Sequence, residues 1–165
     1  MRFSYQWLTE WVDTDLNAEQ AAERLTAAGL EVDALTRLGG ELDGVVVGRI
    51  EACEPHPDAD RLQVCTVDVG QDETLQIVCG APNARAGLRA PVATVGSRLP
   101  GGMKIRAAKL RGVESAGMLC SAPELEIGED ASGLLELADD LEIGAPLARA
   151  LGLPDHAIEL DLTPN

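Results

Sequence analysis

The sequence has few aromatic residues, and all of them lie within its first eleven positions: Phe3, Tyr5, Trp7 and Trp11. Proteins that bind single-stranded nucleic acid by stacking place aromatic side chains against the bases, at about 1–3 kcal/mol per base. The middle and the end of this chain offer no such side chain, which excludes base stacking there. Any nucleic acid bound by these parts contacts them through phosphate, sugar and backbone groups.

Long hydrophobic runs are also missing. No apolar run approaches the roughly 20 residues of a membrane-spanning helix. Residues 1–12 have neither a smooth apolar core nor a small-residue cleavage site, so they do not read as a secretory signal. The composition, 45% hydrophobic and 25% charged over 165 residues, is typical of a folded chain with one domain or slightly more. We therefore expect a cytoplasmic protein without a membrane partner.

Closely spaced metal ligands are absent as well. The cysteines stand alone at positions 53, 65, 79 and 120, and His56 is far from His156 in the sequence. Zinc sites normally need close pairs of such residues. Each cysteine lies in an apolar stretch, which is typical of a small, reduced, buried thiol. We predict no bound metal and no disulfide.

Acidic residues are missing from residues 74–113, although the chain as a whole has a net charge of −15. This acid-free segment contains only cations among its charged residues: Arg85, Arg89, Arg98, Lys104, Arg106, Lys109 and Arg111. Charge runs are usually solvated faces, but a positive segment in an acidic chain also predicts a local surface for a polyanion.

The two ends of the chain share one pattern. Ser4 is a candidate cap for a first helical turn, and Asn17 with Gln20 is a capping box for a helix through residue 28. Residues 31–38 and 157–162 alternate as strands. Because an isolated terminal strand needs a neighbour, we expect these two strands to pair. The C-terminal edge of their sheet should then be open or dimerised.

The middle of the chain reads as short strands between turns. Strands are predicted at residues 45–53, 62–69, 74–78, 88–95 and 104–110, and residues 117–120 and 133–137 are two more short apolar segments. Such a series favours a closed five-stranded Greek-key barrel over a sandwich. The fold class is therefore mainly β with α+β. We expect a barrel of residues 41–151 inserted into a small, truncated α/β domain made of residues 1–40 and 152–165.

The strand predicted at residues 104–110 changes its alternation midway. Lys104 and Arg106 share one parity, whereas Lys109 and Arg111 share the other. An unbroken strand would point one of these pairs into the barrel, where unpaired cations are costly. We expect a bulge or break at residues 107–108 that leaves all four cations outside.

Three segments resemble a known module. They are HPDADRLQVCTVDVG (residues 56–70), IVCGAPNARAG (77–87) and KLRGVESAGMLCS (109–121). They resemble the tRNA-binding module of the oligonucleotide-binding (OB) barrel type. The start MRFSYQWLTEWV and the end AIELDLTPN are similar to bacterial phenylalanyl-tRNA synthetase β subunits, in which the barrel interrupts another domain. Because that β chain is several times longer, the sequence resembles its N-terminal fragment.

The resemblance implies an auxiliary RNA-binding or structural role for this chain. In the complete αβ assembly, a phenylalanine–tRNA ligase, ATP and Mg²⁺ serve the reaction on the α subunit. This fragment is expected to need no cofactor. The implied partners are tRNA, bound weakly through its backbone, the α subunit and the remaining β-subunit domains. Two alternatives stay open: a free-standing non-enzymatic tRNA-binding protein, and a purely structural assembly module.

No catalytic constellation is predicted, because Ser115 and Ser121 have no nearby histidine and no phosphate-loop glycine pattern is present. His56 is expected to be an exposed or hydrogen-bonded turn residue, and residues 80–83 a tight corner rather than an anion loop. A cation beside glycines suits a phosphate contact. The candidate tRNA-binding residues are Arg85, Arg89, Lys104, Arg106, Lys109, Arg111 and Ser115.

Overall fold

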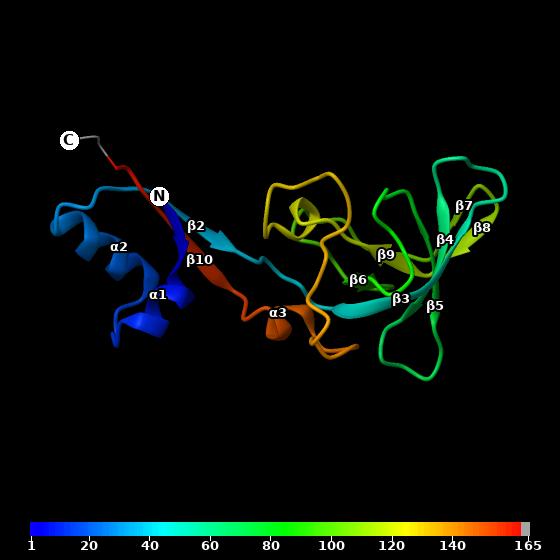
Figure 1. Cartoon of the computed structure of the whole chain (residues 1–165), viewed down its shortest axis with the longest axis horizontal. Coiled ribbons are helices and arrows are strands. Elements are labelled where there is room, and N and C mark those ends of the chain that lie inside the picture. The colour runs from blue at the N-terminus through cyan, green and yellow to red at the C-terminus, as the bar shows by residue number, and fades with distance from the viewer. Residues whose placement is uncertain (163–165) are drawn as a thin grey trace. The chain divides into compact units, whose positions relative to one another are not determined.

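The computed structural model describes residues 1–162, which form mostly β structure in two compact units (Figure 1). Unit 1 combines Met1–Leu38 with the chain from Pro154 onward, and unit 2 is Gly39–Leu153. None of the helices described is long and apolar enough to cross a membrane.

Unit 1 contains a three-stranded antiparallel sheet. Its strands are β1 (Arg2–Ser4), β2 (Val32–Leu38) and β10 (Asp155–Leu160), in the order β1-β10-β2. The predicted pairing of the strand after residue 31 with the C-terminal strand is confirmed. The predicted open C-terminal edge is wrong, because β1, which the sequence analysis did not find, pairs with the other side of β10.

Both helices of unit 1 begin at polar caps, as predicted. The Ser4 hydroxyl accepts the amide of Trp7 at the start of α1 (Tyr5–Trp11). At the start of α2 (Ala18–Ala27), Asn17 and Gln20 exchange side-chain and backbone hydrogen bonds of 2.8 and 3.0 Å. These bonds use amide groups that a helix cannot satisfy internally.

Unit 2 is built on a five-stranded antiparallel sheet in the order β5-β4-β3-β6-β9. Its strands are β3 (Val45–Pro55), β4 (Gln63–Asp68), β5 (Leu75–Cys79), β6 (Arg89–Thr94) and β9 (Gly117–Leu119). The register between β3 and β4 shifts near Ile50, and such an irregularity lets a long strand bend. The first half of β3 pairs with β6 and the second half with β4.

The sheet curls until its two ends meet. Next to β9, the amide of Ala116 donates to the carbonyl of Gln76 in β5 at 2.8 Å. The hydroxyl of Ser115 accepts the amide of Val78 at 3.1 Å. The result is the predicted, nearly closed Greek-key barrel of the OB type rather than a sandwich.

The remaining elements of unit 2 are short. They are β7 (Ala108–Leu110), β8 (Val113–Ser115), the 3₁₀ turn η1 (Pro123–Leu125) and α3 (Leu147–Ala150). The sequence analysis missed β8. The apolar segment at residues 133–137 is not a strand, but the amide of Leu135 donates to the carbonyl of Cys120 at 3.1 Å and that of Leu137 to the carbonyl of Arg89 at 2.8 Å.

The barrel interior holds small aliphatic side chains and most of the thiols. Ile50, Val67 and Ile77 are fully buried there. The cysteines are free thiols, three of them buried and Cys53 half-buried. Burial raises the pKa of Cys120 to about 12, which keeps this thiol protonated and unreactive at neutral pH.

Asp155 joins the two separate segments of unit 1. Its carboxylate accepts the Ser4 hydroxyl and the amides of Gln6 and His156, the last two at 3.1 and 2.7 Å. We predict that Asp155→Ala destabilises unit 1 by about 1–3 kcal/mol, because these donors lose their acceptor. Urea unfolding followed by tryptophan fluorescence measures this, since Trp7 and Trp11 both lie in the unit.

The matched control for this prediction is Asp161→Ala, which removes a carboxylate from an exposed position beyond the end of β10. We expect this variant to unfold within about 0.5 kcal/mol of the unmodified chain. Equal effects of the two substitutions would contradict the role given to Asp155.

Candidate nucleic-acid interface

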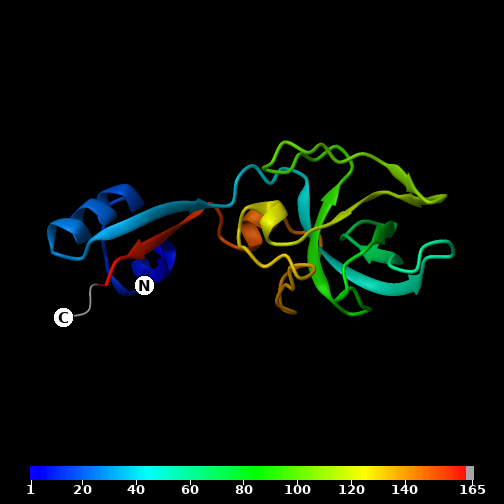
Figure 2. The ribbon, with the colours of Figure 1, turned by 90° about the horizontal axis from the view of Figure 1, so that it is seen from above.

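The segment between β6 and β9 forms two hairpins. The first, here called the PGG hairpin, is residues 97–105 around the turn Pro100-Gly101-Gly102. The second is the β7–β8 hairpin, residues 108–115. Figure 2 shows this yellow-green part of the chain leaving the five-stranded sheet and ending in the β7–β8 ribbon. Both hairpins carry cations from the acid-free segment.

The β7–β8 hairpin has a two-residue loop, Arg111-Gly112. In the strands that flank it, Leu110 pairs with Val113 and Lys109 pairs with Glu114. Arg111 and Gly112 both have positive φ, 48° and 85°. This is the conformation of the tight hairpin turn that Asn-Gly adopts most readily, so an arginine at its first position is strained.

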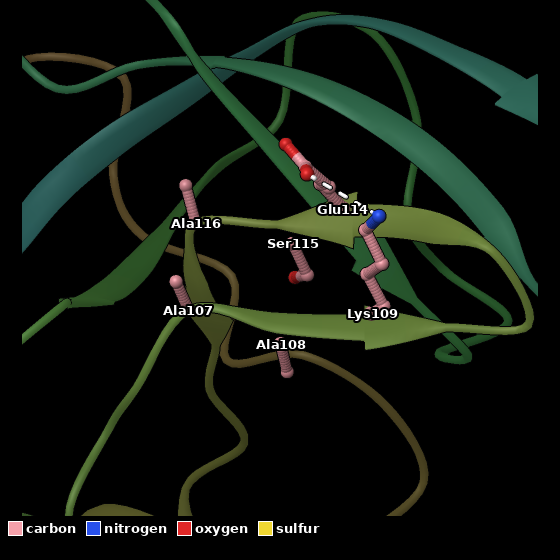
Figure 3. A pocket seen from close by; sticks show the side chains of 6 residues that line it. All are labelled: Ala107, Ala108, Lys109, Glu114, Ser115 and Ala116. Carbon is pink, nitrogen blue, oxygen red and sulfur yellow. Dashed lines mark ion pairs between the residues drawn. The ribbon is translucent and has the colours of Figure 1, made fainter.

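A shallow pocket of about 250 Å³ lies against this hairpin, lined by three alanines together with Lys109, Glu114 and Ser115 (Figure 3). Lys109 Nζ lies 3.8 Å from Glu114 Oε1, so the cation faces an anion across the ribbon. The Ser115 hydroxyl donates to the carbonyl of Gly117 at 3.1 Å and accepts the Val78 amide. Because both functions of this hydroxyl are used, Ser115 closes the barrel and is not a free contact for RNA.

His56 connects the β3–β4 loop to the β7–β8 hairpin. Its Nδ1 accepts the amide of Asp58 at 3.0 Å, which places the ring proton on Nε2. Nε2 then donates to the carbonyl of Leu110 at 2.9 Å. The side chain is only 6% exposed. The prediction of a hydrogen-bonded turn residue is confirmed, and the HPDADR motif positions the hairpin.

Two of the candidate cations are held by the C-terminal part of unit 2. Arg85 forms a two-pronged pair with Glu136, at 2.9 and 3.0 Å. Arg89 donates to the carbonyl of Asp139 and, at 2.7 Å, to that of Leu141. The acid-free segment contains no acidic residue in its sequence, but the fold places the acidic stretch of residues 136–142 next to Arg85 and Arg89. Both guanidinium groups are therefore held within unit 2, Arg85 by a carboxylate and Arg89 by two backbone carbonyls.

The corner at residues 80–83 is also a structural feature. The Asn83 side chain accepts the amide of Leu134 at 2.8 Å and donates to its carbonyl at 3.0 Å, as a neighbouring strand would. Asn83 also donates to Glu136 at 3.1 Å. The interpretation as a tight corner is confirmed.

Three of the predicted contacts keep free charges. Within residues 1–162, Lys104, Arg106 and Arg111 are exposed and make no ion pair or side-chain hydrogen bond. The same holds for Arg98 at the PGG hairpin, which the sequence analysis counted in the acid-free segment but did not place at the site. The two hairpins between β6 and β9 thus carry three of these free cations, and Arg106 lies on the short segment that connects the hairpins.

The expected break in the basic strand is confirmed, although it lies slightly earlier than predicted. Lys104 forms an isolated bridge, residues 105–107 are not in a strand, and β7 starts at Ala108. Ile105 is buried whereas Lys104 and Arg106 are exposed. The break allows the chain to turn Ile105 inward while all four cations stay outside.

In the described part of the chain, no group of three or more His, Cys, Asp or Glu side chains is placed to hold a metal ion.

Hydrogen bonds from Arg85 and Asn83 lower the pKa of Glu136 from 4.5 to about 2. Because this folded-state pKa lies below the unfolded value, the pair stabilises the protein above pH 4.5, and its contribution is lost as the pH falls towards 2.

We predict that Arg85→Gln raises the pKa of Glu136 towards 4.5. Carboxyl ¹³C NMR titration measures it, with Arg24→Gln as a control that leaves Glu136 unchanged. An unaltered Glu136 titration in Arg85→Gln would contradict the assignment.

Residues 45–146 match the family model described as "Putative tRNA binding domain". All 165 residues align with the phenylalanine–tRNA ligase beta subunits of Xanthomonas campestris pv. campestris and Pseudomonas putida, at 61% and 55% identity. The chain spans 21% of the length of each of these relatives. The resemblance to such β subunits is confirmed.

Among solved structures, a MetRS-related protein from Pyrococcus horikoshii is similar with a TM-score of 0.47 and 23% identity. The alignment covers 62% of this chain and 87% of that one. The match to the family model covers more than half of the chain, and it coincides with the barrel and its two cationic hairpins. The chain belongs to the tRNA-binding domain family.

Proposed function

We propose that this chain is the N-terminal part of the β subunit of a cytoplasmic phenylalanine–tRNA ligase, and that its barrel is an auxiliary module that contacts the backbone of tRNA. Aminoacylation belongs to the complete αβ assembly, with ATP and Mg²⁺ used by the α subunit. The partners are tRNA, the α subunit and the remaining domains of the β subunit. The chain is 61% identical over all 165 residues to a ligase β subunit, and this similarity supports the proposal.

The observation that carries the RNA contact is the position of Arg111. It occupies the first position of a tight turn where its φ of 48° is unfavourable for a residue with a bulky side chain. The side chain is exposed and unpaired among the described residues. A strained cation at the tip of a hairpin is explained by a function that needs a charge there, such as binding a phosphate.

The barrel lacks aromatic side chains, so its RNA contacts are electrostatic. Phosphate contacts fix a protein on a nucleic acid without reading its sequence. The free cations on the two hairpins suit this mode of binding, whereas the net charge of −15 limits its strength. The proposed module therefore assists a ligase that selects its tRNA elsewhere.

A second candidate function is that of a structural assembly module. The fold itself engages four of the candidate residues, which favours a role in packing for them: Arg85, Arg89, Lys109 and Ser115.

Filter binding of the chain to tRNA at several salt concentrations separates the two functions. Each phosphate neutralised should add about 0.7–0.9 to the slope of log affinity against log salt. No binding at low salt would favour the structural function and contradict our proposal.

We predict that Arg111→Asn makes unit 2 more stable and weakens its binding to tRNA. Asparagine tolerates positive φ, so the turn should gain about 1 kcal/mol. The loss of one phosphate contact should reduce the salt slope by about 0.7–0.9. Chemical unfolding and filter binding measure the two effects.

The control for this prediction is Arg111→Lys, which keeps both the charge and a side chain that disfavours positive φ. It should bind tRNA nearly as the unmodified chain does, without any gain in stability. If Arg111→Asn bound tRNA with unchanged affinity and slope, the tip of the hairpin would not be a contact.

A further inference from the structure

The PGG hairpin holds two cations directly opposite each other. Arg98 and Lys104 form an antiparallel bridge. The backbone bonds on either side of them run from Leu99 N to Met103 O at 2.9 Å and from Ile105 N to Ser97 O at 2.8 Å. In this pattern Arg98 and Lys104 are a non-hydrogen-bonded pair, the pair in which opposing side chains on one face lie closest.

Like charges in such a pair repel each other. Neither Arg98 nor Lys104 has an acidic partner among residues 1–162, and both are exposed. The carboxylate of Glu126, which lies beside Gly40 near Pro100, forms no ion pair with either of them. Two charges of the same sign that lie directly across from each other on paired strands destabilise the hairpin. Folding alone therefore does not explain these two residues.

The register that creates this pair is strongly specified. Gly102 accepts a φ of 89°, and its amide donates to the carbonyl of Leu99 at 2.8 Å across the turn. Leu99 and Ile105 are 3% and 5% exposed, which anchors both arms of the hairpin in unit 2. The neighbouring positions, Arg98 and Lys104, must then face solvent. The two cations are thus held side by side before any ligand arrives.

We propose that Arg98 and Lys104 form a clamp for one phosphate of the RNA backbone. A phosphodiester between the two side chains would cancel their repulsion, and an anion is the ligand that this arrangement favours most. The arginine can donate two parallel hydrogen bonds to the phosphate oxygens, while the lysine supplies a point charge. This proposal rests on the proposed tRNA contact and names one subsite of it, distinct from Arg111 at the other hairpin.

The test compares Arg98→Gln, Lys104→Gln and the double variant with the unmodified 165-residue chain. In the absence of RNA, either single substitution should raise Tm by about 1–4 °C, and the double variant should gain no more than a single one, because the repulsion needs both charges. In filter binding to tRNA, the double variant should lose about 0.7–0.9 of the salt slope and bind more weakly at low salt.

Two further variants control for the change in charge. The double variant Arg24→Gln/Arg37→Gln alters the net charge equally but changes cations of unit 1, and should keep the salt slope. Lys104→Arg keeps both charges of the clamp and should retain tRNA affinity and the Tm of the unmodified chain.

The outcomes separate the clamp from the function on which it rests. If the double Gln variant bound tRNA with the affinity and salt slope of the unmodified chain, the clamp would be wrong while the tRNA contact would stand. If the unmodified chain itself failed to bind tRNA at low salt, both would fall. Strictly additive gains in Tm from the two single variants would also overturn the clamp, because independent cations do not share a phosphate.

Discussion

The closure of the barrel between β5 and the chain around Ser115 is the interaction on which the rest of unit 2 depends. Ala116 donates to Gln76, Ser115 accepts the Val78 amide, and the Gln76 side chain donates to the carbonyl of Glu114 at 2.8 Å. Without these bonds β5 and β9, the two outer strands of the five-stranded sheet, would be open edges. They also fix the point at which β8 leaves the barrel, and so they set the direction of the β7–β8 hairpin.

The distribution of charge in the folded unit differs from its distribution along the sequence. Arg85, which precedes β6, is paired with the carboxylate of Glu136, and Arg89, at the start of β6, donates to the backbone carbonyls of Asp139 and Leu141. Of the cations that follow β6, Lys109 faces Glu114, whereas Arg98, Lys104, Arg106 and Arg111 have no acidic partner among residues 1–162. The fold therefore divides one positive segment of the sequence into a structural part and a part available to a ligand. Only the second part belongs to the interface.

Much of the fold could be predicted because local signals and the global fold agree. The Asn17–Gln20 box and the alternation of the strand that follows Gly29 each have one simple interpretation. The barrel followed from the spacing of short strands and turns. In contrast, β1 has only three residues, too few for a periodic pattern, so the central place of β10 could not be predicted.

The interface was only partly predictable, because ion pairs between distant residues leave no local signal. Nothing near Arg85 indicates that Glu136 will reach it. The Arg98–Lys104 pair did have a usable signal, since a three-residue turn with proline first and glycine last fixes the register of its arms. The positive φ of Arg111 had none, because an Arg-Gly loop does not by itself predict a tight turn.

The order of strands in unit 1 has a consequence for synthesis on the ribosome. Strands β1 and β2 do not pair with each other, and both pair with β10, which is made more than a hundred residues later. The strands of the barrel all lie in one uninterrupted part of the chain, Gly39–Leu153, so the barrel can complete its pairing before β10 emerges. The sheet of unit 1, by contrast, lacks its central strand until β10 has been translated. Strands β1 and β2 therefore cannot form this sheet while the barrel is being made.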